Sequence, residues 1–220
     1  MPAKTSTTAT RSSDSEIIRD LRPIDEGSIH GVTFDGQRVW FARNDELVAL
    51  DPVTEKVVRR LPVPHADAGT AFDGENLYQL AGDEILVLRP SDGRVVRRMP
   101  APDRGHNSGM AWADGYLFIG QFRESRIQKV DARTGEVVKT LTSDRFVTGV
   151  SVVDGAVWHA ASHDGKPCEL RRLAADGSVE ETLAVPVEGI GGVEGSGDGG
   201  FWCGGEKGRL RLVRKKAARP

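Results

Sequence analysis

The feature that most constrains the fold is a phrase that returns about every forty residues. It reads VVRRLP at 57–62, VVRRMP at 95–100, VVKTLT at 137–142 and VEETLA at 179–184, each time closing one segment of the chain. Repetition at a period of about 20 to 50 residues is typical of chains built from stacked supersecondary units. Each unit then buries its apolar residues against its neighbours, so the repeat has to be interpreted before any single motif.

Each repeated segment reads as four short strands. In the first segment they are expected at 30–34, 38–42, 46–51 and 56–61, with turns that contain Asp-Gly or Pro between them. The strands are rich in Val, Ile, Leu and aromatic residues. Gly or Pro recurs too often for helices of ordinary length, so we expect almost no helix. A four-stranded unit with this period is the blade of a β-propeller.

A strand of the closing type also stands before the first unit, as IIRDLR at 17–22. The fifth unit has candidates for three strands, near 191–195, 200–204 and 209–214, and lacks a fourth. We therefore expect residues 16–22 to supply the outer strand of the last blade and to close the ring. The sequence predicts an all-β fold, a five-bladed β-propeller of four-stranded antiparallel blades, as a single domain over 16–214.

Composition limits what surrounds this domain. Residues 1–15 are rich in Ser and Thr and are expected to form a disordered leader, and residues 215–220 a solvated basic tail. Thirty Lys and Arg against 32 Asp and Glu give a net charge of −2, which argues against nucleic acid or a membrane as partner. The two cysteines and the absence of an apolar run in the leader predict a cytoplasmic protein with reduced thiols.

Antiparallel geometry sorts the loops of such a ring between its two ends. The loops that lead into each first strand and those that join the second and third strands share one end, which we call the mouth. The turns at the opposite, hairpin end are short and alike, as in Asp35-Gly36 and Asp73-Gly74, whereas the mouth loops are irregular. Function on a rigid scaffold tends to lie on variable loops, so the site is predicted at the mouth.

One acidic residue departs from the repeat. Glu194 lies two residues after the inner-strand glycine of its unit, a place occupied in the other units by Thr33, Ala71, Ala111 and Ser151. A carboxylate on an innermost strand must be solvated, paired or raised in pKa. Glu194 is therefore a candidate catalytic acid, together with His30 and His106 at the mouth; the alternative is a channel glutamate satisfied by water or a neighbouring arginine.

Other polar residues fall on the mouth loops and are candidates for ligand binding. Arg123 and Arg145 could hold a carboxylate or phosphate of a ligand, or could pair with nearby acids. Imidazole and carboxylate groups could also hold a divalent metal, although no fixed ligand spacing supports a metal site. The expected ligand is a small polar molecule. The ligand-binding candidates are His65, Asp67, Asn107, Gln121, Arg123, Arg145, His163 and Glu188.

The repeat phrases carry a resemblance to a known family. HGVTFDGQRVW, SGMAWADGYLF and TGVSVVDGAVW, followed by VALDPVTEKVV and QKVDARTGEVV, resemble the glutamine cyclotransferases, the plant-type glutaminyl cyclases, over about residues 16–214. More loosely they resemble virginiamycin B lyase and gluconolactonase-like propellers. In the cyclases a glutamate typically precedes the inner-strand glycine of the first blade; this chain has His30 there and Ala68 in the next blade.

The resemblance implies a five-bladed propeller and a transferase or lyase. We expect general acid and base catalysis through Glu194 and a mouth histidine. The alternative is a non-catalytic propeller that binds a ligand or a protein partner, and fold alone does not choose between the two.

Overall fold

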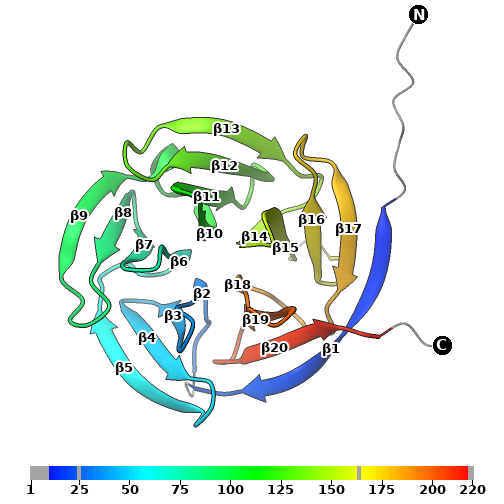
Figure 1. Ribbon diagram of the computed structural model, residues 1–220, viewed down its shortest axis with the longest axis horizontal. Helices are drawn as coiled ribbons and strands as arrows, with labels where there is room; N and C mark the ends of the chain where they lie inside the picture. Colours follow the sequence, from blue (N-terminus) through cyan, green and yellow to red (C-terminus); the bar gives the residue numbers. More distant parts are fainter. Residues whose placement is uncertain (1–9, 24–25, 163–164, 218–220) are drawn as a thin grey trace, which may run out of the picture.

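The computed structural model describes residues 10–23, 26–162 and 165–217, and in these the chain forms a ring of antiparallel sheets around a central axis (Figure 1). Three sheets have four strands each, in the orders β2-β3-β4-β5, β6-β7-β8-β9 and β10-β11-β12-β13. Their strands are β2 (Val32–Phe34), β3 (Val39–Arg43), β4 (Glu46–Asp51), β5 (Lys56–Pro62), β6 (Thr70–Phe72), β7 (Leu77–Ala81), β8 (Glu84–Leu88), β9 (Val95–Pro100), β10 (Asn107–Ala113), β11 (Tyr116–Gln121), β12 (Arg126–Asp131) and β13 (Val137–Thr142).

The rest of the ring is one eight-stranded sheet of order β14-β15-β16-β17-β1-β20-β19-β18. It consists of two four-stranded sets, β14 to β17 and β18 to β20 with β1, which are joined where the long strand β1 pairs with β17. Its strands are β14 (Val147–Val153), β15 (Ala156–Ala161), β16 (Glu169–Leu173), β17 (Val179–Ala184), β1 (Arg11–Leu21), β20 (Leu210–Lys215), β19 (Gly200–Gly204) and β18 (Gly192–Gly195). The predicted all-β fold is confirmed, and the described helical structure is limited to one 3₁₀ turn, η1 (Pro102–Gly105). No helix in the described ranges is long and apolar enough to cross a membrane.

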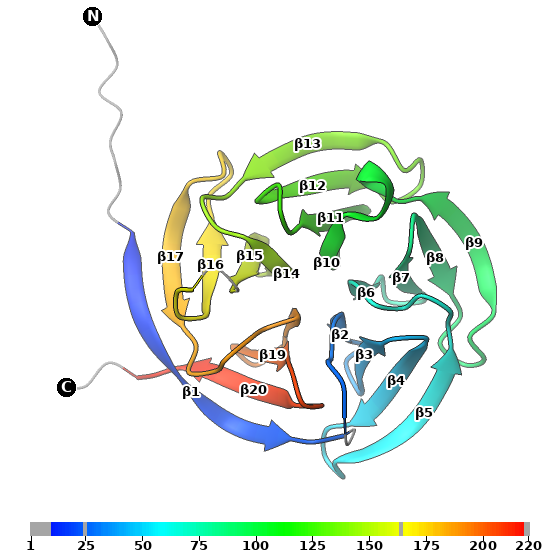
Figure 2. The same ribbon diagram turned by 180° about the vertical axis from the view of Figure 1, so that it is seen from behind.

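Strand β1 closes the ring as the sequence predicts. From Ser15 to Leu21 it pairs antiparallel with β20 (Figure 2). The start of the strand differs from the prediction, because residues 11–15 were expected in a disordered leader. From Arg11 to Asp14 the strand instead runs parallel to β17, and the Ser15 hydroxyl donates to the Ala184 carbonyl at 2.7 Å. Backbone pairing needs no apolar side chain, so a Ser-rich segment can extend a strand. Residues 1–9 of the expected leader and 218–220 of the tail lie outside the described residues.

The recurring outer-strand phrase also joins neighbouring sheets. Its third position is a cation in four of its five copies, and each cation donates to a backbone carbonyl of the next hairpin around the ring. The donor and acceptor pairs are Arg19 with Pro52, Arg59 with Ser91, Arg97 with Ala132 and Arg133, and Lys139 with Ala175. These cations therefore link neighbouring sheets in addition to protecting exposed strand edges.

The fifth copy reverses the charge. Glu181 stands at the third position of the phrase in β17, where the strand edge is covered by β1. Its carboxylate accepts from Lys215 at 2.5 Å and lies 3.7 Å from Arg11. Here the phrase supplies the acid, Glu181, and the neighbouring strand β20 supplies the cation, Lys215. The phrase therefore still contacts its neighbour, but with the charges exchanged.

Glycines bring the inner strands together at the axis. A side chain on Gly109 would place its Cβ 2.4 Å from the Val150 nitrogen, and one on Gly192 would place it 1.9 Å from the His30 carbonyl oxygen. Equivalent close contacts occur around the whole ring, so the inner strands approach one another backbone to backbone at this level. We call this layer the glycine belt; its members are Gly31, Gly69, Gly109, Gly149 and Gly192.

Candidate functional site

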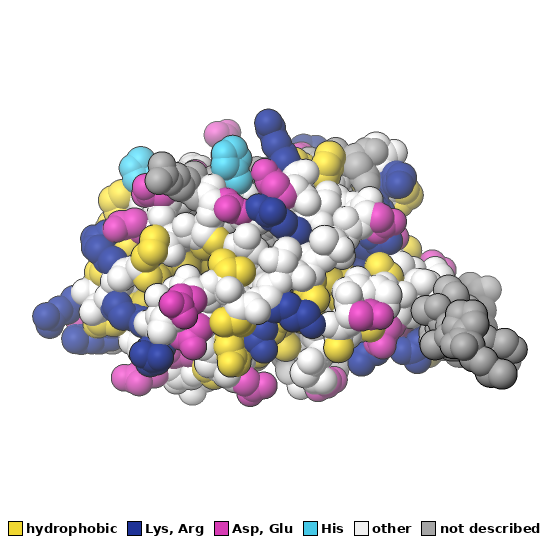
Figure 3. Space-filling view, turned by 90° about the horizontal axis from the view of Figure 1, so that it is seen from above, with side chains coloured by type: hydrophobic (Ala, Val, Ile, Leu, Met, Phe, Trp, Pro, Cys, Tyr) yellow, Lys and Arg dark blue, Asp and Glu magenta, His cyan; other side chains and the backbone are white. Residues whose placement is uncertain are grey.

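A cavity of about 250 Å³ lies at the mouth, on the axis directly outside the glycine belt. Its floor is formed by the residues that precede the belt glycines: His30, Ala68, Ser108, Thr148 and Gly191. The walls add Asp67, Asn107, Phe122 and Ile190. Every unit of the ring thus contributes to the cavity. In the side view of Figure 3 the visible histidine side chains gather toward one end of the molecule.

His30 is the titratable group on the floor of this cavity. Its backbone N–H donates to the Ala42 carbonyl at 3.1 Å, which holds the residue beside β3. Burial lowers the pKa of the partly buried imidazole below 6.5, and the nearby Asp67 carboxylate partly opposes that shift. The ring is therefore neutral at pH 7 and can accept a proton, and Asp67 would stabilise the imidazolium that results.

The remaining polar side chains of the cavity are fixed by local hydrogen bonds. The Ser108 hydroxyl donates to the Val147 carbonyl at 2.6 Å, Thr148 to the Ala160 carbonyl at 3.3 Å, and the Asn107 amide to the Pro102 carbonyl at 2.8 Å. Among the described residues that line the cavity, Asp67 is the one acidic residue, and none is a lysine or an arginine. The cavity therefore favours a polar ligand that carries an amine or another positive group.

Glu194 lies on the other side of the glycine belt from this cavity. It accepts hydrogen bonds from Ser151 at 2.8 Å, from Thr33 at 3.2 Å and from the Gly195 N–H at 2.8 Å. Burial raises its pKa to about 7, and these three hydrogen bonds offset only part of that shift. Comparison of the repeats with one another identified Glu194 as an unusual carboxylate. Because it lies two residues after Gly192 along β18, however, it is on the hairpin side of the glycine belt. Glu194 and His30 therefore do not share a cavity.

Two of the predicted ligand contacts belong to structural networks instead. Arg145 is buried, pairs with Glu169 at 3.0 Å and donates to the Pro167 carbonyl at 3.3 Å. Gln121 is buried between Asp103, whose carboxylate it contacts, and Arg126. Neither side chain lines the mouth cavity.

The other predicted residues lie around the cavity rather than in it. His65, His106 and Arg123 are exposed on mouth loops, and Glu188 is exposed beside Lys207 at 3.5 Å. His163 lies outside the described residues. Within the described ranges no group of three His, Cys, Asp or Glu residues is placed to hold a metal ion. Of the predicted candidates the mouth cavity brings together His30, Asp67 and Asn107.

Sequence reasoning missed six lining residues: Ala68, Ser108, Phe122, Thr148, Ile190 and Gly191. Ser108 and Thr148 could have been found, because both immediately precede an inner-strand glycine, as His30 does. Phe122 lies on a β11–β12 loop whose path the repeat does not specify, and it is fixed by contact with Phe146 at a ring-centroid distance of 4.8 Å.

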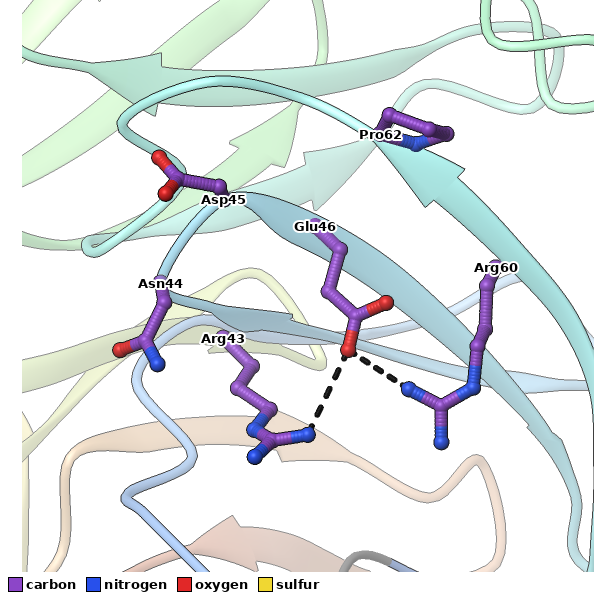
Figure 4. Close-up of a pocket in the computed structure, with 6 residues that line it drawn as sticks. All are labelled: Arg43, Asn44, Asp45, Glu46, Arg60 and Pro62. Atoms are coloured by element: carbon purple, nitrogen blue, oxygen red, sulfur yellow. Dashed lines mark hydrogen bonds and ion pairs between the residues drawn. The ribbon is translucent and has the colours of Figure 1, made fainter.

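A second hollow, of about 360 Å³, lies on the outer rim of the first sheet, where β3, β4 and β5 meet. Figure 4 shows Glu46 between two guanidinium groups, with its Oε1 atom 2.6 Å from Arg60 and 3.5 Å from Arg43. The Asp45 carboxylate beside it accepts the His65 backbone N–H at 2.8 Å. These acidic groups are already occupied by structural contacts, so the mouth cavity is the stronger candidate site.

Comparison with solved structures places this geometry in a known architecture. The chain is similar to a glutaminyl cyclase from Myxococcus xanthus, with a TM-score of 0.81, 16% sequence identity, and coverage of 96% of this chain and 100% of that chain. The chain folds as a β-propeller. It is also similar to the Cps50 (Swd1) propeller domain of Myceliophteria thermophila (TM-score 0.59, 14% identity, 90% of this chain and 99% of that one).

The WD40 propeller domain of Doa1 is a further structural neighbour of this propeller, with a TM-score of 0.56, 15% identity and coverage of 84% of this chain and 63% of that chain. No protein-family model and no curated protein matches the sequence. At these identities the likeness concerns the fold, and what the propeller does has to be argued from its own residues.

Proposed function

We propose that the mouth cavity binds a small polar molecule that carries an amine, and that His30 transfers a proton in a transferase reaction of the glutaminyl cyclase type. The observation that carries this proposal is an imidazole on the floor of an axial cavity that a carboxylate also lines, with burial that lowers the pKa of the imidazole. The likeness in shape to a glutaminyl cyclase supports it. We further infer that the ring counts as five blades, because each of the five belt glycines closely approaches the inner-strand segment of the next unit, and Gly192 approaches that of the first unit.

In the proposed reaction the amine of an N-terminal glutamine attacks its own side-chain carboxamide carbon. A carbon–nitrogen bond forms, His30 takes the proton that the amine loses, and the imidazolium returns it to the leaving nitrogen as ammonia departs. The Asp67 carboxylate stabilises the positive charge that His30 carries between these two transfers. A lyase reaction would use the same imidazole to remove a proton from carbon.

The test is ammonia release from an N-terminal glutaminyl dipeptide by the wild-type protein and by His30→Gln. A positioned proton-transfer group contributes about 10² to 10⁴ in rate, so His30→Gln should lose at least about a hundredfold in kcat. His65→Gln is the matched control, because His65 is exposed at the mouth and does not line the cavity. Turnover by His30→Gln at the wild-type rate would contradict the proposal; dipeptide binding without turnover in the wild-type protein would favour a non-catalytic binding propeller.

A further inference from the structure

A separate hollow of about 300 Å³ lies at the hairpin end of the ring, between the β10–β13 sheet and the β14–β17 strand set. Its floor is apolar, with Phe118, Leu141 and Val157. Three cations line it: Lys129 on β12, Lys139 on β13 and Arg172 on β16. This hollow lies on the opposite side of the glycine belt from the mouth cavity, and the two share no lining residue.

The hollow arises where the chain departs from its own repeat. Lys129 is the cross-strand partner of Lys139. The equivalent partners in the first two sheets are Ala49, opposite Arg59, and Val87, opposite Arg97. Ala49 and Val87 are buried between neighbouring sheets at 0% and 3% exposure. Lys129 thus stands where the first two sheets have a core residue, and the β14–β17 set also carries a cation at the equivalent position, Arg172 opposite Glu181.

The positive charge in the hollow exceeds the negative charge. Arg172 is paired with Glu180, the one acid of the lining. The Lys129 ammonium lies 3.8 Å from the centroid of the Tyr116 ring, and Lys139 donates to the Ala175 carbonyl at 2.5 Å. In the described part of the chain neither lysine forms an ion pair with a carboxylate. The charge of Lys139 also helps to lower the pKa of the nearby Asp176 carboxylate, so Lys129 is the lysine whose charge is left most fully to a ligand.

We propose that this hollow is a binding site for a phosphate monoester with a flat or apolar body. A phosphate monoester carries close to two negative charges at pH 7, and the two lysines that line the hollow form no ion pair with a carboxylate among the described residues. Ammonium groups bind phosphate as point charges, without a required bidentate geometry. The floor of Phe118, Leu141 and Val157 would cover the organic part of the molecule.

The test is calorimetric titration of the full-length protein with phenyl phosphate at low salt. We expect saturable binding of one molecule per chain, weaker binding of inorganic phosphate, and affinity that falls as salt is raised. The decisive variant is Lys129→Val, which restores the residue that the second sheet carries at this place. It should fold as stably as the wild-type protein and bind phenyl phosphate at least about tenfold more weakly.

The matched control for the site is Arg59→Gln. Arg59 makes the same kind of bond to the next hairpin as Lys139 does, but at an interface with Ala49 in place of Lys129. If loss of a bond between neighbouring sheets were enough to weaken phenyl phosphate binding, Arg59→Gln would also bind it more weakly. We expect Arg59→Gln to bind phenyl phosphate as tightly as the wild-type protein does. Unchanged affinity in Lys129→Val, or no saturable binding to the wild-type protein at millimolar phenyl phosphate, would overturn the proposal.

Discussion

At the residue scale, two titratable side chains near the axis, His30 just before β2 and Glu194 on β18, sit in environments that shift their pKa values in opposite senses. His30, on the mouth side of the glycine belt, has its pKa lowered by burial, whereas the pKa of Glu194, on the hairpin side, is raised to about 7. In both cases burial disfavours the charged form. Comparison of the repeats identified Glu194 as unusual. The sequence could not reveal that the belt separates it from the mouth, because that depends on contacts between strands.

Replacement of Glu194 by Gln should change how stability depends on pH. With a folded pKa of about 7 against 4.5 for the free group, the folded state binds more protons than the unfolded state between these values. The Glu194 contribution to stability is therefore greatest below pH 4.5 and falls by up to about 3 kcal/mol as the pH rises to 7 and above. Glu194→Gln lacks this decline.

Urea unfolding of the wild-type protein and Glu194→Gln at pH 5 and pH 8 measures the difference. The variant should gain stability relative to the wild-type protein at pH 8. The exposed carboxylate of Glu124, changed to Gln, is the control and should leave the pH dependence as it is. The same stability difference between wild type and Glu194→Gln at both pH values would contradict the raised pKa.

At the element scale, strand β1 connects two strand sets, and the sequence predicted only one of these contacts. The phrase IIRDLR matches the other outer strands and so revealed the pairing with β20. The parallel pairing of Arg11–Asp14 with β17 has no such signal, because it uses backbone groups of a polar segment. The phrase likewise predicted outer strands but not that Arg59 and Arg97 reach carbonyls of the next hairpin.

Truncation of the N-terminus should separate the two contacts of β1. Deleting residues 1–15 removes the pairing with β17 and the Ser15 bond to Ala184, and should lower the melting temperature by several degrees. Deleting residues 1–22 also exposes the edge of β20 and should cost clearly more. Deleting residues 1–9 is the control with β1 intact. Equal melting temperatures for all three truncated proteins would show that β1 does not hold the ring closed.

At the scale of the whole molecule, a repeat of similar sheets predicts the ring well and its site poorly. The all-β architecture, the pairing of β1 with β20 and the mouth position of His30, Asp67 and Asn107 follow from period, turns and strand direction. Arg145 and Gln121 were predicted as ligand contacts at the mouth, but their side chains contact Glu169 and Asp103, which come from other segments. Such pairings depend on loop paths, which differ between units and carry no repeat signal.

The central claim is that a ligand occupies the mouth cavity and not the polar groups around Glu194, which lie on the hairpin side of the glycine belt. Calorimetric titration with L-glutaminamide, a small molecule that carries an amine and a carboxamide, tests it directly. Asp67→Asn removes the charge that would hold the amine and should weaken binding at least about tenfold, whereas Glu194→Gln should bind as tightly as the wild-type protein. Loss of binding in Glu194→Gln with unchanged binding in Asp67→Asn would contradict the account.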